Sequence, residues 1–361
     1  MKMIQTIGIV SLSSGILGEA SVKHELALGL QRLRDMGLRV KCLPHALTGL
    51  EYIDKHPEKR AEDLLLAFQD PEIDLILCAI GGDDTYRLLP YLFAQDELKN
   101  AVCAKPFLGF SDTTLNHFML HKLGLPTFYG QSFLADVCEL GPDMLPYSRG
   151  FFEELIATGG IREVRPSPVW YRERECFDAS QLGVALPALP DMGFELLQGS
   201  PRFSGKILGG CIDSMFDCFD GTRYADMPAL CKEYGLFPSA EDWQGRILLL
   251  ESSEERMPPA LYRRALEYLK EAGVFGAVAG VLVGKPMNRQ YEDEYKRLLV
   301  EVADDPALPI VCNLNIGHAQ PRCILPFGVM AHVDAEEQLI RFDGNSCAGG
   351  GETNTTLALS S

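Results

Sequence analysis

The chain lacks the features that mark membrane, secreted and nucleic-acid-binding proteins. Its 361 residues carry 33 Lys and Arg against 50 Asp and Glu, and the resulting net charge of −17 argues against nucleic acid and anionic membranes as partners. No apolar run approaches the length that spans a bilayer, and the first residues lead into a strand pattern without the apolar core of a signal peptide. We therefore expect a cytoplasmic protein with neither nucleic-acid nor membrane partners.

Paired cysteines are also missing, although cysteine itself is not rare. The 11 cysteines stand singly and form no Cys-x-x-Cys pair, so we interpret them as reduced thiols rather than a disulfide framework or a zinc site. His117 and His121 have a spacing that can bind metal, but no third ligand is near them in sequence. We expect these histidines to pack or to face solvent, and we predict no metal and no cofactor.

The composition is that of a globular protein, 47% apolar and 23% charged, and the length suggests two domains. In the first half, strand patterns alternate with helical patterns. The continuous apolar run at residues 73–80 is typical of a strand buried on both faces of a parallel sheet. The sequence therefore predicts an α/β protein with an N-terminal Rossmann-like parallel sheet and a site at the carboxyl ends of its strands.

Changes in composition divide the chain into four segments. Residues 1–165 form the predicted N-terminal domain, and residues 166–203, which are rich in proline, form a connection. Residues 204–343 resume the α/β pattern and end in two predicted strands around a turn at residues 334–336. Residues 344–361 are mostly small and polar, which predicts a disordered tail.

The tripeptide Gly109-Phe110-Ser111 is the most informative motif of the sequence. It ends an apolar stretch and precedes a helical pattern, so it predicts a serine at a strand-to-helix corner, where backbone amides can aim a nucleophile. Helix N-capping is an equally good interpretation of Ser111. The two are distinguished by whether a base and a carboxylate converge on the hydroxyl.

Two residues at other strand ends could supply these groups. His318 lies in a loop after an apolar strand, and Glu251 directly follows the apolar run at residues 247–250. A histidine that solvates its loop and an acid that caps a helix are the structural alternatives. The pattern thus indicates a candidate base and a candidate orienting acid in the second half of the chain.

Gly81-Gly82 follows the strand at residues 73–80 and suits an oxyanion hole, because no side chain obstructs its backbone amides. A tight turn is the alternative. The run Gly81-Gly82-Asp83-Asp84-Thr85 also differs by one residue from the Gly-Gly-Asp-Gly-Thr segment of some nucleotide and lipid kinases. Asp84 places a carboxylate where that segment has glycine, which would repel a phosphate. A nucleotide-dependent kinase remains an alternative, and it predicts thermal stabilisation by Mg-ATP.

These motifs, taken with several others in chain order, resemble the LD-carboxypeptidase family of serine peptidases. The resemblance runs from Ile7 to about Phe342. The matching segments are Ile80-Gly81-Gly82, Arg87-Leu88-Leu89-Pro90-Tyr91-Leu92, Leu108-Gly109-Phe110-Ser111-Asp112-Thr113-Thr114, Thr127-Phe128-Tyr129-Gly130, Lys206-Ile207-Leu208-Gly209-Gly210, Ile247-Leu248-Leu249-Leu250-Glu251, Ala272-Gly273-Val274-Phe275, Gly317-His318-Ala319-Gln320-Pro321 and Leu325-Pro326-Phe327-Gly328.

The resemblance implies a triad assembled across two domains, with Ser111 as nucleophile, Glu251 as orienting acid and His318 as base. It also implies an oxyanion hole made by the backbone N–H groups of Gly82 and Asp112. The second domain would be an α/β domain built on a small β-barrel. The implied activity is hydrolysis of an amide bond without metal or cofactor, by a homodimer.

Two branches of this family differ in substrate. One cleaves murein L,D-tetrapeptides, and the other, similar to the microcin immunity peptidase, cleaves an amino acid or peptide from a nucleotide-like group. The segment Pro166-Ser167-Pro168-Val169-Trp170 leans towards the second branch, where Trp170 would stack on the leaving group.

The substrate contacts that we expect besides Trp170 are Gly81, Asp83 and Cys211. Cys211 stands where family members commonly have asparagine, and Asp83-Asp84 also departs from the family pattern. The substrate, a small peptide or an aminoacyl-nucleotide, therefore stays open. A non-catalytic peptide-binding relative is a further alternative, in which Ser111 would not react with an acylating probe.

Overall fold

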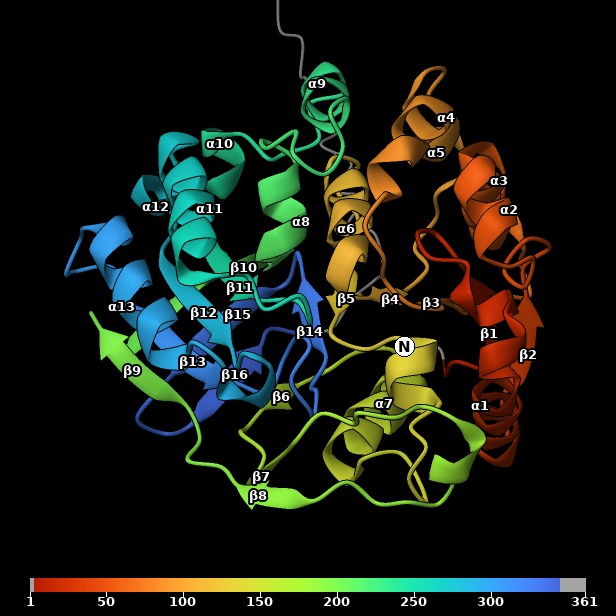
Figure 1. The fold of residues 1–361 in the computed structure, drawn as a ribbon. Coiled ribbons are helices and arrows are strands. Elements are labelled where there is room, and N and C mark those ends of the chain that lie inside the picture. Colours follow the sequence, from red (N-terminus) through yellow and green to blue (C-terminus); the bar gives the residue numbers. More distant parts are fainter. Residues whose placement is uncertain (1–2, 345–361) are drawn as a thin grey trace, which may run out of the picture.

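The computed structural model describes residues 3–344, which form two main sheets and their flanking helices (Figure 1). The first sheet has six strands in the order β14-β5-β4-β3-β1-β2. Strands β1 to β5 pair in parallel, and β14 runs antiparallel to β5. The bounds are β1 (Thr6–Val10), β2 (Arg39–Cys42), β3 (Leu75–Cys78), β4 (Phe107–Gly109), β5 (Thr127–Tyr129) and β14 (Leu325–Phe327).

This sheet confirms the predicted parallel α/β arrangement of the first half. Strands β1, β3 and β4 are buried along their whole length, as expected for continuous apolar runs that are covered on both faces. Gly37 follows the first helix with φ of 79°, the left-handed conformation that ends a helix. The helices of this half are α1 (Lys23–Asp35), α2 (Leu50–Lys55), α3 (Pro57–Gln69), α4 (Leu89–Phe93), α5 (Glu97–Ala101), α6 (Thr114–His121) and α7 (Pro146–Thr158).

The second sheet has eight strands in the order β6-β16-β15-β10-β11-β12-β13-β9. Its centre, from β10 to β13, is parallel, and the outer pairs are antiparallel. Within residues 3–344 no pairing joins β6 to β9, so closure into the expected barrel is not confirmed. The bounds are β6 (Glu163–Val164), β9 (Glu195–Gln198), β10 (Arg202–Cys211), β11 (Ile247–Glu251), β12 (Gly280–Gly284), β13 (Ile310–Leu314), β15 (Met330–Asp334) and β16 (Leu339–Phe342).

Helices of the second half pack against this sheet and against the first half. In Figure 1, α8 of the second half lies beside α6 of the first half, between the two sheets. The carboxyl ends of β4 and β11 therefore face a common region. The helices are α8 (Ile212–Asp217), α9 (Met227–Glu233), α10 (Ala240–Trp243), α11 (Pro259–Glu271), α12 (Val274–Ala277) and α13 (Glu292–Ala303).

Two short strands cross the boundary that we expected between the halves. β6, which ends the first segment, pairs with β16 of the second sheet, and β14 of the third segment pairs with β5 of the first sheet. Residues 324–342 thus contain β14 in addition to the two predicted strands β15 and β16. A three-residue strand shows no periodicity in sequence, which is why the pattern did not predict β14.

The predicted connection, residues 166–203, also contains secondary structure. Strands β7 (Val169–Tyr171) and β8 (Ala188–Pro190) form a two-stranded sheet, and β9 joins the edge of the second sheet. The disorder predicted for residues 344–361 lies outside the described residues except for Gly344. None of the helices in the described part of the chain has both the length and the apolar character needed to cross a bilayer.

The β5–β14 pair yields a test of how far the two halves stabilise each other. Phe327 of β14 is 3% exposed and stacks on Tyr129 of β5, with ring centroids 5.3 Å apart. We expect Phe327→Ala to lower the free energy of unfolding by about 3–5 kcal/mol, since it leaves a cavity between the halves. Urea denaturation followed by fluorescence and by circular dichroism would measure this effect. Leu261→Ala, on the exposed side of α11, is the control, and an equal loss in both variants would contradict the prediction.

Candidate active site

Ser111 occupies a sharp turn directly after β4. Its φ of 65° lies in the left-handed region, which is uncommon for residues other than glycine and often marks strained functional sites. The predicted helix begins here as a 3₁₀ turn, Ser111–Thr113, and continues as α6. Ser111 is the first residue of this turn rather than its N-cap, so the capping interpretation is wrong.

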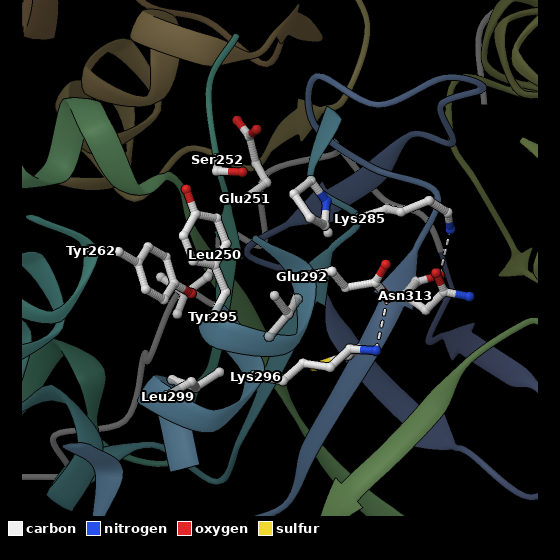
Figure 2. Close-up of a pocket in the computed structure, with 14 residues that line it drawn as sticks. Leu250, Glu251, Ser252, Tyr262, Lys285, Glu292, Tyr295, Lys296, Leu299 and Asn313 are labelled. Atoms are coloured by element: carbon white, nitrogen blue, oxygen red, sulfur yellow. Dashed lines mark hydrogen bonds and ion pairs between the residues drawn. The ribbon is translucent and has the colours of Figure 1, made fainter. Parts of the chain in front are cut away.

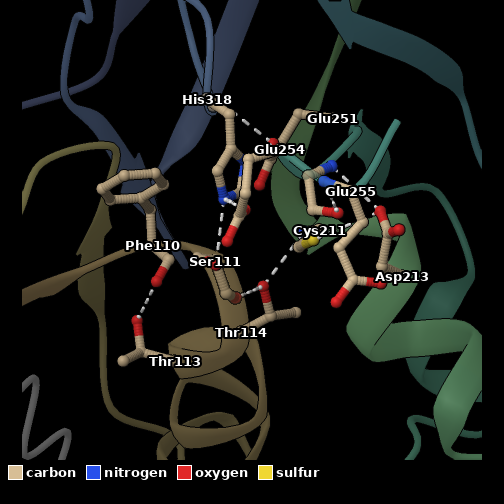
Figure 3. Close-up of polar contacts among 12 residues, drawn as sticks. Phe110, Ser111, Thr113, Thr114, Cys211, Asp213, Glu251, Glu254, Glu255 and His318 are labelled. Atoms are coloured by element: carbon tan, nitrogen blue, oxygen red, sulfur yellow. Dashed lines mark hydrogen bonds and ion pairs between the residues drawn. The ribbon is translucent and has the colours of Figure 1, made fainter. Parts of the chain in front are cut away.

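The structure brings the two predicted partners to this serine (Figure 3). The Nε2 atom of His318 lies 3.0 Å from Oγ of Ser111, and Nδ1 lies 2.7 Å from Oε2 of Glu251. The backbone N–H of His318 also donates to Oε2, at 3.3 Å. All three residues are buried. A serine, a histidine and a carboxylate in this order can transfer a proton away from the serine hydroxyl.

Tyr129 connects the acid to the serine turn, a role that the sequence did not indicate. Its hydroxyl donates to Oε1 of Glu251 at 2.6 Å and accepts the backbone N–H of Ser111 at 3.2 Å. Burial, together with the charge of Glu251, raises the pKa of Tyr129 well above its ordinary value. The hydroxyl therefore keeps its proton and donates to Glu251. Its place at the carboxyl end of β5, next to β4, is the signal that could have revealed it.

The glycine pair lies directly against the serine. A Cβ atom on Gly81 would lie 2.6 Å from Cβ and 2.7 Å from Oγ of Ser111, and 3.2 Å from the backbone nitrogen of Asp112. Gly82 has φ of 151°, and a Cβ there would lie 2.2 Å from Oγ of Ser13. Both positions thus require glycine, and the backbone of Gly81 comes near the amide of Asp112, which belongs to the expected oxyanion hole.

The Asp112 side chain holds this loop in place. Its carboxylate accepts hydrogen bonds from the hydroxyl of Ser13 at 2.7 Å and from the backbone N–H of Thr85 at 2.9 Å. These bonds tie the serine turn to the end of β1 and to the loop after β3. Burial raises the pKa of Asp112 above its ordinary value. The side chain is therefore structural.

Asp84, the residue that departs from the kinase segment, is buried in an ion-pair cluster. Its Oδ2 atom lies 3.0 Å from Arg60 and 3.0 Å from Arg87. The two arginines that could bind a phosphate thus already pair with this carboxylate, which argues against a phosphate site at this loop.

His318 carries a second acidic neighbour. Oε2 of Glu254 lies 3.1 Å from Nε2 of His318. Burial alone would lower the pKa of His318, but the charges and hydrogen bonds of Glu251 and Glu254 outweigh it and raise the pKa to about 10. The hydrogen bond to His318 in turn lowers the pKa of Glu254 to about 2. Glu254 was not expected from the sequence, where it looks like an ordinary surface acid.

Ser111 and His318 open onto a cavity of about 530 Å³, a size that accommodates a small ligand. Its walls come from the first half, the connection and the second half, and they include Gly81, Leu134, Tyr171, Arg174, Phe177 and Glu254. A second cavity, behind Glu251, measures only about 20 Å³ (Figure 2). That volume suits about one water molecule and no substrate.

Of the other expected substrate contacts, Gly81 lines the cavity and Trp170 and Asp83 do not. The ring of Trp170 is covered instead by the Arg289 guanidinium, 5.4 Å from its centroid, while the next residue, Tyr171, lines the cavity. Asp83 is exposed and pairs with Arg223 at 3.5 Å. Adjacent side chains on a strand point to opposite faces. The prediction of Trp170 as a cavity residue was therefore one residue away from Tyr171, which lines the cavity.

Cys211 does not line the cavity but supports the serine turn from the second sheet. Its backbone N–H donates to Oγ1 of Thr114 at 3.0 Å, and that hydroxyl donates to the carbonyl of Ser111 at 2.7 Å. Cys211, Glu251 and His318 also place potential metal ligands within 4.8 Å of one another. Burial and nearby carboxylates raise the pKa of the Cys211 thiol well above its ordinary value, which disfavours the thiolate that a metal would require.

Comparison with known protein families assigns both halves of the chain. Residues 7–130 match the model of the LD-carboxypeptidase N-terminal domain, and residues 204–333 match that of the LD-carboxypeptidase C-terminal domain. The chain belongs to the LD-carboxypeptidase family. It is accordingly a peptidase.

Individual members of the family include both expected branches. The chain is 32% identical to the murein tetrapeptide carboxypeptidase of Pseudomonas aeruginosa, over 84% of this chain and 86% of that protein. It is 25% identical to the microcin C7 self-immunity protein MccF of Escherichia coli, over 93% and 92%. A crystal structure of an MccF-like protein from Streptococcus pneumoniae in complex with AMP matches with a TM-score of 0.93 and 60% identity, covering 94% of this chain and 99% of that chain.

The contact between Gly81 and Ser111 gives a sharp test of this geometry. We expect Gly81→Ala to lower kcat/KM for an amide substrate by about 100-fold or more, because the added methyl group would displace the serine side chain. Gly150→Ala is the matched control, since a Cβ atom at that exposed position in α7 meets nothing within 4 Å. Thermal unfolding of both variants would show whether the fold survives. Activity of Gly81→Ala close to that of Gly150→Ala would contradict the proposed packing.

Proposed function

We propose that this peptidase is a serine amidase of the MccF-like branch, which cleaves the bond between an aminoacyl or short peptidyl group and a nucleotide-like leaving group. The hydrogen-bonded series Ser111–His318–Glu251, with separations of 3.0 and 2.7 Å, carries the proposal. The adjoining 530 Å³ cavity supports it, because its volume lies in the range of sites that bind small-molecule ligands. The 60% identity to a protein that was crystallised with AMP favours the same ligand class.

In the proposed mechanism Ser111 is the nucleophile. Its Oγ attacks the amide carbonyl carbon while Nε2 of His318 takes the hydroxyl proton, and Glu251 stabilises the imidazolium through Nδ1–H. The backbone N–H groups of Gly82 and Asp112 donate to the oxyanion.

The imidazolium then gives its proton to the leaving nitrogen, the C–N bond breaks, and an ester to Ser111 remains. Water attacks this ester with His318 again as base, which releases the carboxylic acid and restores the serine hydroxyl.

A murein L,D-tetrapeptide is the second candidate substrate. The 32% identity to a murein tetrapeptide carboxypeptidase favours it, and the same serine chemistry would release the terminal residue. The 60% identity to a protein crystallised with AMP makes the murein peptide the less favoured substrate. We also propose that residues 1–165 and 204–343 act as two domains around the site, joined by residues 166–203. The homodimer and the cytoplasmic location stay predictions.

Replacing the nucleophile tests the proposed chemistry directly. We expect Ser111→Ala to lower kcat by about 10⁴-fold or more while leaving thermal unfolding unchanged. The assay would present an aminoacyl-sulfamoyl adenosine and an L,D-tetrapeptide in parallel and follow both products by mass spectrometry. Ser180→Ala, an exposed serine in the connection, is the control.

The outcomes of this assay separate the alternatives. Substantial hydrolysis by Ser111→Ala would refute the serine mechanism. Cleavage of the tetrapeptide alone would move the protein to the murein branch. Ligand binding by the wild type without any turnover or acylation of Ser111 would indicate a non-catalytic relative.

A further inference from the structure

Glu254 competes with the nucleophile for one nitrogen of the base. Its Oε2 atom lies 3.1 Å from Nε2 of His318, and Oγ of Ser111 lies 3.0 Å from the same nitrogen (Figure 3). Glu254 follows β11 by three residues, and its side chain is 62% exposed at the edge of the cavity. The mechanism above has no use for this contact.

The two contacts place different demands on the protonation state of His318: the serine hydroxyl can donate to Nε2 or accept from it, whereas a carboxylate can only accept. With Nδ1–H donating to Glu251, a neutral imidazole presents a lone pair at Nε2, which accepts from the serine hydroxyl and repels a carboxylate. A carboxylate at 3.1 Å is favourable only when Nε2 also carries a proton. The ligand-free arrangement is therefore that of an imidazolium held between two acids, and an imidazolium cannot act as a base.

Other groups also surround His318, and burial by itself opposes this protonated state. Asp213, which is partly buried, lies near enough to the ring for their charges to interact, and burial raises the pKa of Asp213 above its ordinary value. The guanidinium of Arg322 donates to the carbonyl of His318 at 2.8 Å, and its Nη1 also pairs with Asp136 at 3.0 Å. The aromatic ring of Phe110 meets the imidazole edge-on, at 5.1 Å. Glu254 is the one exposed group among them, so it is the one that a ligand can reach.

The backbone on both sides of Glu254 is anchored, but its side chain is not. The N–H of Ser253 donates to the Asp213 carboxylate at 2.9 Å, and the N–H of Glu255 donates to Oγ of Ser253 at 3.2 Å. The Glu255 carboxylate pairs with Arg223 and faces away from the base. A rotation of the Glu254 side chain can thus release His318 without moving the loop.

The charges that line the cavity indicate what would draw Glu254 away. Arg174 pairs with Glu139 at 2.6 Å, and the Glu173 carboxylate pairs with Arg256. Among the described residues, the ion pair with His318 is the one ion pair of Glu254. The two arginines that line the cavity, Arg174 and Arg322, pair with Glu139 and Asp136, so a positive group entering beside Ser111 would meet the Glu254 carboxylate.

We propose that Glu254 is a positioning residue that keeps His318 protonated in the ligand-free site, and that a positive charge on the acyl part of the substrate draws it off and frees the base. The substrate class is then an amide whose acyl group carries a free α-ammonium group or a basic side chain. This inference rests on the proposed serine amidase function. It makes the charge of the substrate a switch for the catalytic base as well as a binding contact.

The test compares Glu254→Gln with the wild type and with Glu255→Gln as the matched control. The substrates are four sulfamoyl adenosines that differ in the acyl group. The lysyl group carries an α-ammonium and a side-chain ammonium, the norleucyl group only the α-ammonium, the Nα-acetyl-lysyl group only the side-chain ammonium, and the N-acetyl-norleucyl group neither. In the wild type we expect kcat/KM for each charged substrate to exceed that for N-acetyl-norleucyl by about tenfold or more. In Glu254→Gln we expect that advantage to fall to about twofold or less, and in Glu255→Gln to persist. The two singly charged substrates show which source of charge acts.

The pH profile provides a readout that loss of packing would not produce. Glu254→Gln removes the negative charge beside Nε2, which lowers the pKa of His318. The acid limb of the pH profile of kcat/KM for the uncharged substrate should therefore move to lower pH by about one unit or more. At pH 7 this variant should therefore cleave N-acetyl-norleucyl substrate faster than the wild type does. An unchanged charge preference and an unchanged acid limb in Glu254→Gln, or equal changes in Glu255→Gln, would overturn the proposal.

A direct titration separates this inference from the proposed function. NMR of ¹⁵N-histidine-labelled protein, without substrate, should show a lower pKa for His318 in Glu254→Gln than in the wild type or Glu255→Gln. If the wild type cleaves none of the substrates, the amidase function fails, while this titration still decides whether Glu254 controls the base. An equal His318 pKa in all three proteins would overturn the role of Glu254.

Discussion

The hydrogen-bonded series from Ser111 through His318 and Glu251 to Tyr129 is the constraint on which the rest of the structure depends. It begins at the end of β4, crosses to the end of β11 in the other sheet and returns to β5. It thus ties the two halves of the chain together at the site. The exchanged strand β14, the contact of α6 with α8, and the glycines packed against Ser111 all act to keep these strand ends together.

The same series explains why buried charge is tolerated at this place. A buried carboxylate is costly unless it is hydrogen-bonded, and Glu251 accepts from the Tyr129 hydroxyl as well as from His318. The other acid at His318, Glu254, is exposed, so water or a ligand can compensate its charge when it leaves the histidine. In a chain with a net charge of −17, this site thus holds one carboxylate whose partner can change when a ligand enters.

The parts that could be predicted are those in which a residue's role follows from its place at a strand end. Ser111, Glu251, His318 and Gly81-Gly82 could be named as candidates because parallel strands bring their carboxyl ends to one region, and the family resemblance then implied their roles. The sequence could not show that Trp170 lies under Arg289 while Tyr171 lines the cavity, because one residue of register decides it. Glu254 was equally hidden, since nothing local distinguishes it from other surface acids.

The sequence by itself determined the alternation of strands and helices in the two halves, the sharp turn at Ser111 and the types of residue available for chemistry. These properties depend on side-chain periodicity and on local backbone preferences, which neighbouring residues set. Only the tertiary structure decided that Leu325–Phe327 would extend the first sheet, that Tyr129 would join Glu251 to Ser111, and that Glu254 would face His318. Strand partners, protonation states and cavity walls depend on distance and burial between segments far apart in the chain, and no local pattern encodes them.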